Sequence, residues 1–129
     1  MFKMEIKIPL LLLLIVFAQS EQVALSIISV SNEASSVVQP VYSSLRGGKM
    51  VYIKAQGHSP DPSDNLIFVG TFPCTVPADG VTDTFITCVT TDTGSSSNIN
   101  NMPVTLISYG TSVTTSYPNT VYFQTGHTP

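Results

Sequence analysis

Thr71-Phe72-Pro73-Cys74-Thr75-Val76 and, further along, Phe85-Ile86-Thr87-Cys88-Val89-Thr90 are the two short runs that decide the fold. Both are rich in β-branched and aromatic residues, which are typical of strands, and turn-forming residues separate them. Their cysteines are the only two in the chain, so we expect Cys74 and Cys88 to link neighbouring strands of a small β domain. Two free buried thiols are the alternative. Zinc is disfavoured, because two thiols cannot complete its four-ligand shell.

The N-terminus has the pattern of a secretory signal peptide. Lys3, Glu5 and Lys7 precede an apolar run over residues 9–17, and small residues predict cleavage after Ser20. The alternative is a membrane anchor, but the run is well short of the ~20 residues that span a bilayer. We therefore expect residues 1–20 to be removed and residues 21–129 to form one domain without a membrane span. The product would be secreted or extracellular, where disulfides persist.

The charge of the chain argues against one class of partner. Residues 21–129 hold three Lys and Arg against seven Asp and Glu, a net charge of −4. Nucleic-acid binding requires clustered cations that neutralise phosphates. We therefore expect no nucleic-acid partner.

Apolar residues recur with a period near two, in short runs broken by Gly, Pro, Asn, Asp and Ser. This is the pattern of half-buried strands, and in the run 50–55 it places Val51, Ile53 and Ala55 on the inward face. No window after residue 20 shows an apolar face at helical spacing. The chain is predicted to be all-β, an immunoglobulin-like β-sandwich of about seven strands. The expected strands cover residues 23–30, 50–55, 66–69, 74–76, 84–90, 104–109 and 120–124.

Three motifs occur in order: Gly47-Gly48-x-x-Val51-x-Ile53-x-x-x-Gly57, Asn65-x-Ile67-x-Val69-Gly70-x-x-Pro73-Cys74-x-Val76 and Ile86-x-Cys88-x-Thr90. Together with the closing residues 122–129 they resemble the IPT/TIG domain, an immunoglobulin-like fold of plexins, fibrocystin-like surface proteins and transcription factors. The resemblance covers nearly all of residues 24–129. It implies a disulfide between Cys74 and Cys88.

The glycines of these motifs have a physical role beside the resemblance. Gly47 and Gly48 can adopt positive φ and so form a tight hairpin entry. Gly57 would close the strand that follows, and Gly70 is a further structural turn. Pro73 fits the start of an edge strand, which can spare a backbone N–H.

The chain offers no convergent catalytic set. His58 and His127 are the only histidines, and no Gly-x-Ser-x-Gly nucleophile motif occurs. Glycoside hydrolysis needs two carboxylates facing one cleft, whereas the aspartates lie in turn-rich sequence. We expect no enzyme activity and no cofactor.

Two loops and a set of tyrosines are the candidates for contact. Asp61, Asp64 and Asn65 carry oxygen ligands suited to calcium, but they lack the spacing of a dedicated loop, so turn capping is the favoured interpretation and no metal site is expected. The polar segment 90–101 is the second loop. The tyrosines are candidates for protein or glycan contact, although ordinary packing is favoured for them: Tyr42, Tyr52, Tyr109 and Tyr117.

The predicted function is a secreted or cell-surface, non-catalytic module that binds an extracellular protein or glycan, or serves as a structural spacer. It would be one unit of a tandem array, with further IPT/TIG copies as neighbours if the chain is part of a longer protein. The alternative is an accessory sandwich domain of a carbohydrate-active enzyme. Nucleic-acid binding, as in transcription factors of this fold, is opposed by the signal peptide and the negative charge.

Overall fold

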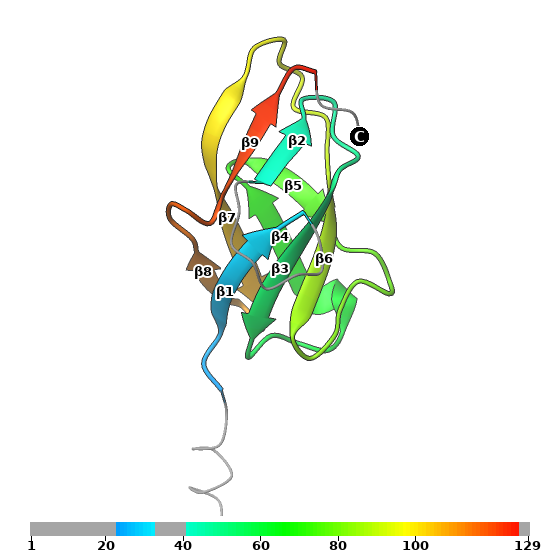
Figure 1. Cartoon of the computed structure of the whole chain (residues 1–129). Coiled ribbons are helices and arrows are strands. Elements are labelled where there is room, and N and C mark those ends of the chain that lie inside the picture. The colour runs from blue at the N-terminus through cyan, green and yellow to red at the C-terminus, as the bar shows by residue number, and fades with distance from the viewer. Residues whose placement is uncertain (1–22, 33–40, 127–129) are drawn as a thin grey trace, which may run out of the picture.

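The computed structural model describes residues 23–32 and 41–126 (Figure 1). The predicted signal peptide and His127 lie outside this part. The described part is built from nine strands and one short 3-10 helix, and it contains no α-helix. The elements are β1 (Ser26–Ser31), β2 (Val41–Ser44), β3 (Met50–Gln56), η1 (Pro62–Asp64), β4 (Asn65–Val69), β5 (Phe72–Thr75), β6 (Phe85–Thr90), β7 (Ile99–Ser108), β8 (Thr111–Thr114) and β9 (Thr120–Gln124).

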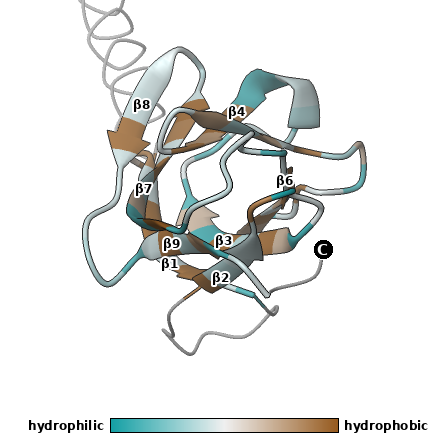
Figure 2. Cartoon of the chain, turned by 90° about the horizontal axis from the view of Figure 1, so that it is seen from above, coloured by the Kyte–Doolittle hydropathy of each residue, from teal (hydrophilic) through white to brown (hydrophobic). Residues whose placement is uncertain are grey.

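The strands are hydrogen-bonded in the order β1-β3-β6-β5-β4-β7-β9-β2, with β8 added to β7. β2 and β9 are parallel, and the other pairs are antiparallel. Seen from above, the strands form a ring around the interior (Figure 2). The all-β prediction is confirmed. The expected two separate sheets are not seen, because a ladder of two residue pairs between β5 and β6 joins the strands into one curled sheet.

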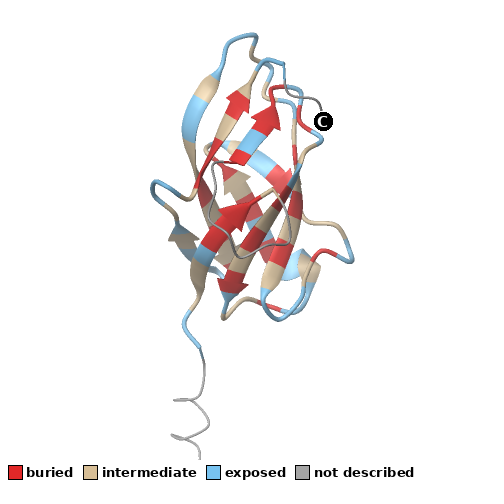
Figure 3. Cartoon of the chain, in the orientation of Figure 1, coloured by how far each residue is buried: buried red, intermediate tan, exposed pale blue. Residues whose placement is uncertain are grey.

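Buried residues alternate with more exposed ones along the strands, as the alternating colours in Figure 3 show. In β3, Val51, Ile53 and Ala55 are buried, whereas Lys54 is half-buried and Met50 is exposed. The predicted faces of this strand are therefore confirmed. Every strand except β8 places at least one buried apolar side chain in the core, and β8 adds only the half-buried Val113.

The prediction of about seven strands is too low by two, because the sequence pattern does not reveal β2 and β8. β2 holds two buried serines among its four residues, and β8 has a single apolar residue, so neither shows a clear apolar alternation. β7 also begins earlier than expected, at Ile99. Its register against β9 shifts between Ile99 and Met102, and Asn101 adopts a φ of 57°, so the period-two pattern is interrupted there.

Pro73 does not lie on an edge strand, since β5 pairs with β4 on one side and with β6 on the other. The ladder to β6 begins only at Cys74. The lack of an N–H on Pro73 therefore costs no hydrogen bond to β6. Proline is tolerated here for the same reason as on an edge strand, where the N–H has no partner strand. The Pro73 carbonyl accepts a hydrogen bond of 2.9 Å from Thr91 Oγ1.

Candidate functional site

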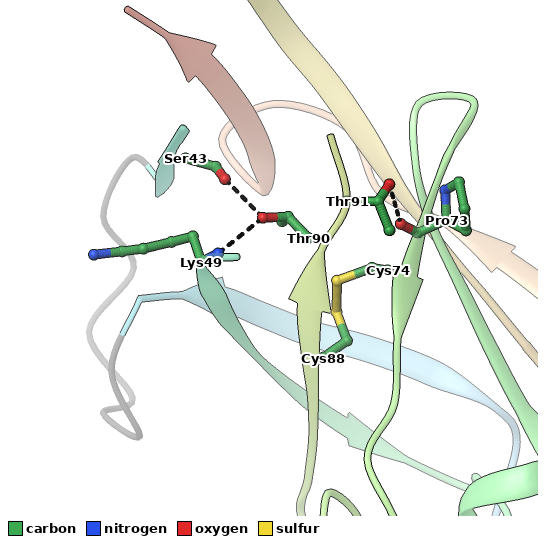
Figure 4. The surroundings of a disulfide bond; sticks show 7 residues. All are labelled: Ser43, Lys49, Pro73, Cys74, Cys88, Thr90 and Thr91. Carbon is green, nitrogen blue, oxygen red and sulfur yellow. Dashed lines mark hydrogen bonds between the residues drawn. A yellow bond between two sulfur atoms is a disulfide. The ribbon is translucent and has the colours of Figure 1, made fainter. Parts of the chain in front are cut away.

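The predicted disulfide is present and joins β5 to β6 (Figure 4). The Cα atoms of Cys74 and Cys88 lie 5.4 Å apart, within the usual range for a disulfide. Both cysteines are buried, with exposed fractions of 3% and 0%. The bond spans the two-pair ladder that connects the two halves of the sheet, so it braces the sheet where few backbone hydrogen bonds hold it.

A buried pair of hydroxyls lies close to the disulfide (Figure 4). Ser43 Oγ and Thr90 Oγ1 are 2.9 Å apart, and Thr90 Oγ1 also accepts a hydrogen bond of 3.1 Å from the Lys49 backbone N–H. The pair connects β2 to the end of β6, and each hydroxyl has a partner, as buried polar groups require. Sequence reasoning missed this contact, since Ser43 and Thr90 are 47 positions apart and serine and threonine carry no pairing signal of their own.

The Gly47-Gly48 turn lies against the end of β6. The two glycines have φ values of 78° and 82°, and the Gly48 N–H donates to the Thr90 carbonyl at 2.8 Å. The expectation of a hairpin entry at this turn is wrong, because β2 pairs with β9 whereas β3 pairs with β1 and β6. Gly57 and Gly70 also adopt positive φ, at 75° and 62°.

We expect Gly47→Ala to destabilise the domain far more than Gly110→Ala does. Both glycines have nearly the same φ, 78° and 75°, so both alanines carry a left-handed penalty of about 1–2 kcal/mol. A Cβ at Gly47 would lie 2.3 Å from the backbone carbon of Thr91, whereas nothing lies within 4 Å of one at Gly110. The clash adds ~1–3 kcal/mol. Urea unfolding measures the difference, and equal losses for the two variants would contradict the close approach of Gly47 to Thr91.

The loop before β4 uses its carboxylates for its own hydrogen bonds. Asp61 Oδ1 accepts from the Ser63 backbone N–H at 3.0 Å and so caps η1. Ser59 Oγ donates to Asp64 Oδ2 at 3.1 Å, and Asn65 Nδ2 donates to the Ser59 carbonyl at 2.9 Å. Turn capping is thus confirmed for this loop. Within residues 23–32 and 41–126, no three His, Cys, Asp or Glu residues are grouped as metal ligands would be.

Calcium is therefore expected to leave the melting temperature of the domain unchanged. The Asp61 and Asp64 carboxylates already accept hydrogen bonds within the loop, and a bound ion would have to displace these donors. Thermal unfolding in buffer with millimolar calcium, compared with the same buffer containing a chelator, measures the effect. A calcium-dependent rise that Asp61→Asn abolishes would show that the loop binds the ion after all.

The remaining candidate residues are spread over the surface. His58 Nε2 lies 2.6 Å from the Thr82 carbonyl oxygen, which ties two loops together. Tyr42 packs against Tyr122 with ring centroids 5.5 Å apart. Tyr109 and Tyr117 are 65% and 72% exposed, and they flank β8 in the sequence. Tyr109 lies in the turn between β7 and β8 and Tyr117 in the loop between β8 and β9, whereas Tyr42 lies on β2 and the half-buried Tyr52 on β3.

The polar loop 90–101 borders a groove of about 700 Å³. Asp92, Gly94, Ser95 and Ser96 line one side of it, and the segment 124–126 lines another. Asp92 Oδ1 accepts a hydrogen bond of 2.8 Å from the Gly94 N–H, so this carboxylate also stabilises its own loop. Leu45, Arg46 and the ends of β2 and β9, at Ser44 and Gln124, complete the lining of the groove.

These features define a disulfide-braced, all-β domain. No family model matches the chain, and no curated protein matches it. Among solved structures, it is similar to the full extracellular region of plexin A4 with domains 1 to 8, at 16% identity and a TM-score of 0.56, over 78% of this chain and 8% of that one. A second structure of the same region, with domains 1 to 10, gives 16% identity and a TM-score of 0.53, over 78% and 7%.

The likeness concerns the fold. The chain spans less than a tenth of the length of the plexin chains that it matches, so it corresponds in size to a small part of such an extracellular region. The described residues include no helix that is long and apolar enough to cross a membrane.

Proposed function

We propose that this chain is an extracellular, non-catalytic module of the IPT/TIG type that binds a protein or a glycan, or acts as a spacer in a tandem array. The carrying observation is the all-β fold, which is similar to part of the extracellular region of plexin A4, together with the disulfide of this chain. The motifs around Gly47, Gly70 and Cys88 support the finer assignment to the IPT/TIG type. The predicted signal peptide and the disulfide both favour the secretory route.

The distribution of charge supports contact rather than catalysis. Among the nine described strands, only β3 contains a Lys, Arg, Asp or Glu, namely Lys54, so the strand surfaces present mainly hydroxyl, amide, aromatic and aliphatic groups. Asp61, Asp64 and Asp92 accept hydrogen bonds within their own loops. Such a surface suits a neutral partner.

Secretion of the full chain from cultured animal cells tests the localisation. A tagged chain should appear in the medium with Glu21 as its first residue and with no free thiol. A matched variant, Leu11→Arg with Leu13→Arg, interrupts the apolar run and should stay inside the cell. Retention of the unaltered chain in the cytosol with its N-terminus intact would refute an extracellular module.

Binding of the secreted domain to cell surfaces tests the contact function. Surface staining that protease treatment of the cells removes would indicate a protein partner, and staining that glycosidase treatment removes would indicate a glycan. If the domain is secreted and folded but stains no cell type, binding to a cell-surface protein or glycan is excluded, and the role as a spacer is favoured.

A further inference from the structure

The described domain has two opposite ends along the strand direction. The antiparallel ladder of β3 with β6 joins Met50 to Val89 and Lys54 to Phe85, so the residues before β3 and after β6 lie at one end. The residues after β3 and before β6 lie at the other. Figure 1 shows the last described residue at the first end and the first described residue at the second. The C-terminal end comprises residues 45–49, 91–98 and 125–126, and the N-terminal end comprises residues 23–25, 57–64, 81–84 and 109–110.

The two ends carry opposite charge. The C-terminal end holds two cations and one carboxylate, a net charge of +1: Arg46, Lys49 and Asp92. The N-terminal end holds three exposed carboxylates and no Lys or Arg, a net charge of −3 with His58 neutral: Asp61, Asp64 and Asp83. Within residues 23–32 and 41–126, the exposed guanidinium of Arg46 has no hydrogen bond or ion pair. This cation is therefore available to a partner.

The C-terminal end is hollowed. The groove of about 700 Å³ lies here, and Leu45 and Arg46 line it side by side. Ser96 and Gln124 add a hydroxyl and an amide to its lining. A tyrosine side chain entering this groove would meet an aliphatic side chain, a cation and polar partners for its hydroxyl, which suits a ring with one polar tip.

The N-terminal end presents such a ring. Tyr109 is 65% exposed in the turn between β7 and β8, and its φ is 51°. A bulky residue is unusual in this left-handed region, where Gly, Asn and Asp are favoured, and strained residues of this kind cluster at functional sites. Asn65 pairs with Ser108, so Asp64 and Tyr109 are neighbours at the end of the β4–β7 ladder. A carboxylate beside an aromatic ring at this end thus corresponds to a guanidinium beside an aliphatic side chain at the other.

We propose that copies of this chain associate head to tail, with the N-terminal end of one copy docked on the C-terminal end of the next. Tyr109 of one copy enters the groove of the other and packs on Leu45, and Asp64 faces Arg46. The contact joins a negative end to a positive one, and such complementarity fixes the orientation of two partners. The inference rests on the proposed binding function and gives it a protein partner, a second copy of this chain.

A second copy is favoured as the occupant because one molecule carries both complementary surfaces. An unrelated partner would have to match only one end, and the charge of the opposite end would have no counterpart. A symmetric contact, of one end with the same end of another copy, would bring like charges together. Head-to-tail contact also leaves a free end of each kind, so association continues beyond the dimer.

Sedimentation of the tagged, secreted chain at increasing concentration tests the association. The average mass should rise between about 10 μM and about 1 mM, the range of a weak contact. Arg46→Glu reverses a charge at the C-terminal end, and Tyr109→Asn removes the ring at the N-terminal end. Each should weaken the association at least about tenfold. Asparagine is favoured at a left-handed position, so Tyr109→Asn should melt no lower than the unaltered domain, which separates loss of contact from loss of folding.

An equimolar mixture of the two variants tests the head-to-tail arrangement. Arg46→Glu keeps an intact N-terminal end, and Tyr109→Asn keeps an intact C-terminal end. Each variant alone should be a monomer, whereas the mixture should form a dimer that grows no further, because only one complementary pair of ends remains. Asp79→Lys and Leu66→Asn are the matched controls. They reverse a charge beside the middle of β6 and remove a 55% exposed apolar side chain from β4, and they should associate as the unaltered chain does.

Several results would overturn the inference. One is an unaltered chain that stays monomeric up to about 1 mM, and another is a variant pair whose mixture stays monomeric. Association that survives Arg46→Glu and Tyr109→Asn would also overturn it. So would a loss of association in either control, because the contact would then lie on the strands rather than at the ends.

These outcomes are separable from the proposed function. If the chain is not secreted, the proposed function fails whatever the association. If the chain is secreted and stains cell surfaces but stays monomeric, the binding function stands and a second copy is not its partner.

Discussion

Replacing both Cys74 and Cys88 by alanine is expected to lower the free energy of unfolding by about 3 kcal/mol, within the 2–5 kcal/mol range for small secreted domains. The bond closes a loop with a sequence separation of 14 residues, so its loss enlarges the conformational freedom of the unfolded chain. The loss also weakens the native sheet, because β5 and β6 share only the pairs of Cys74 with Thr90 and of Thr75 with Val89.

Urea unfolding of the oxidised domain and of the double variant measures this loss. Reduction of the unaltered domain should reproduce most of it, whereas the same reductant should not change the double variant. Hydrogen exchange should show that the Thr75 and Val89 amides lose protection first. Titration of two thiols in the native, oxidised domain would contradict the presence of the bond.

Replacing Phe123 by alanine is expected to cost about 3–5 kcal/mol, the usual loss for a large buried aromatic residue. Phe123 is fully buried on β9, where β2 pairs on one side and β7 on the other. Its ring meets Phe72 edge to face, with centroids 5.7 Å apart. The cavity would therefore open between β9 and β5, and the surrounding strands could relax only partly.

Two variants serve as controls for this loss. Phe123→Leu retains much of the apolar volume and should lose less than half as much stability as Phe123→Ala. Tyr122→Ala alters the neighbouring side chain, which is half-buried on the opposite face and donates a hydrogen bond to Asn101 at 2.7 Å. It should cost about 1 kcal/mol. If Phe123→Ala cost no more than Tyr122→Ala, Phe123 would not be a core residue.

The features that sequence could predict are those with a local pattern. The alternation of Val51, Ile53 and Ala55 marks the inward face of β3, since successive side chains of a strand point to opposite faces. The two cysteines can pair only with each other, and the turn formers between them favour neighbouring strands. Asp61 is recognisable as a turn residue because its side chain bonds to the backbone two residues on.

The position of β8 in the sheet could not be predicted in this way. β8 has only Val113 as an apolar residue, so its four residues show no apolar alternation that would predict a strand. The sequence identifies Tyr109 and Tyr117 as candidates, but it does not show that a strand lies between them. Asn119 accepts from the Val30 N–H and Asn32 from the Tyr42 N–H. The sequence gives no signal for these bonds, because the backbone groups lie on other elements.

The sequence by itself determined the all-β class, the inward face of β3 and the identity of the disulfide partners, because side-chain periodicity and a unique cysteine pair need no knowledge of the rest of the chain. Only the tertiary structure decided that the strands form one curled sheet, that Asn119 and Asn32 bond to the backbone of β1 and β2, and that β8 joins the sheet through β7. Strand order and edge position arise from backbone hydrogen bonds between distant segments, and these bonds involve groups that nearly every residue shares.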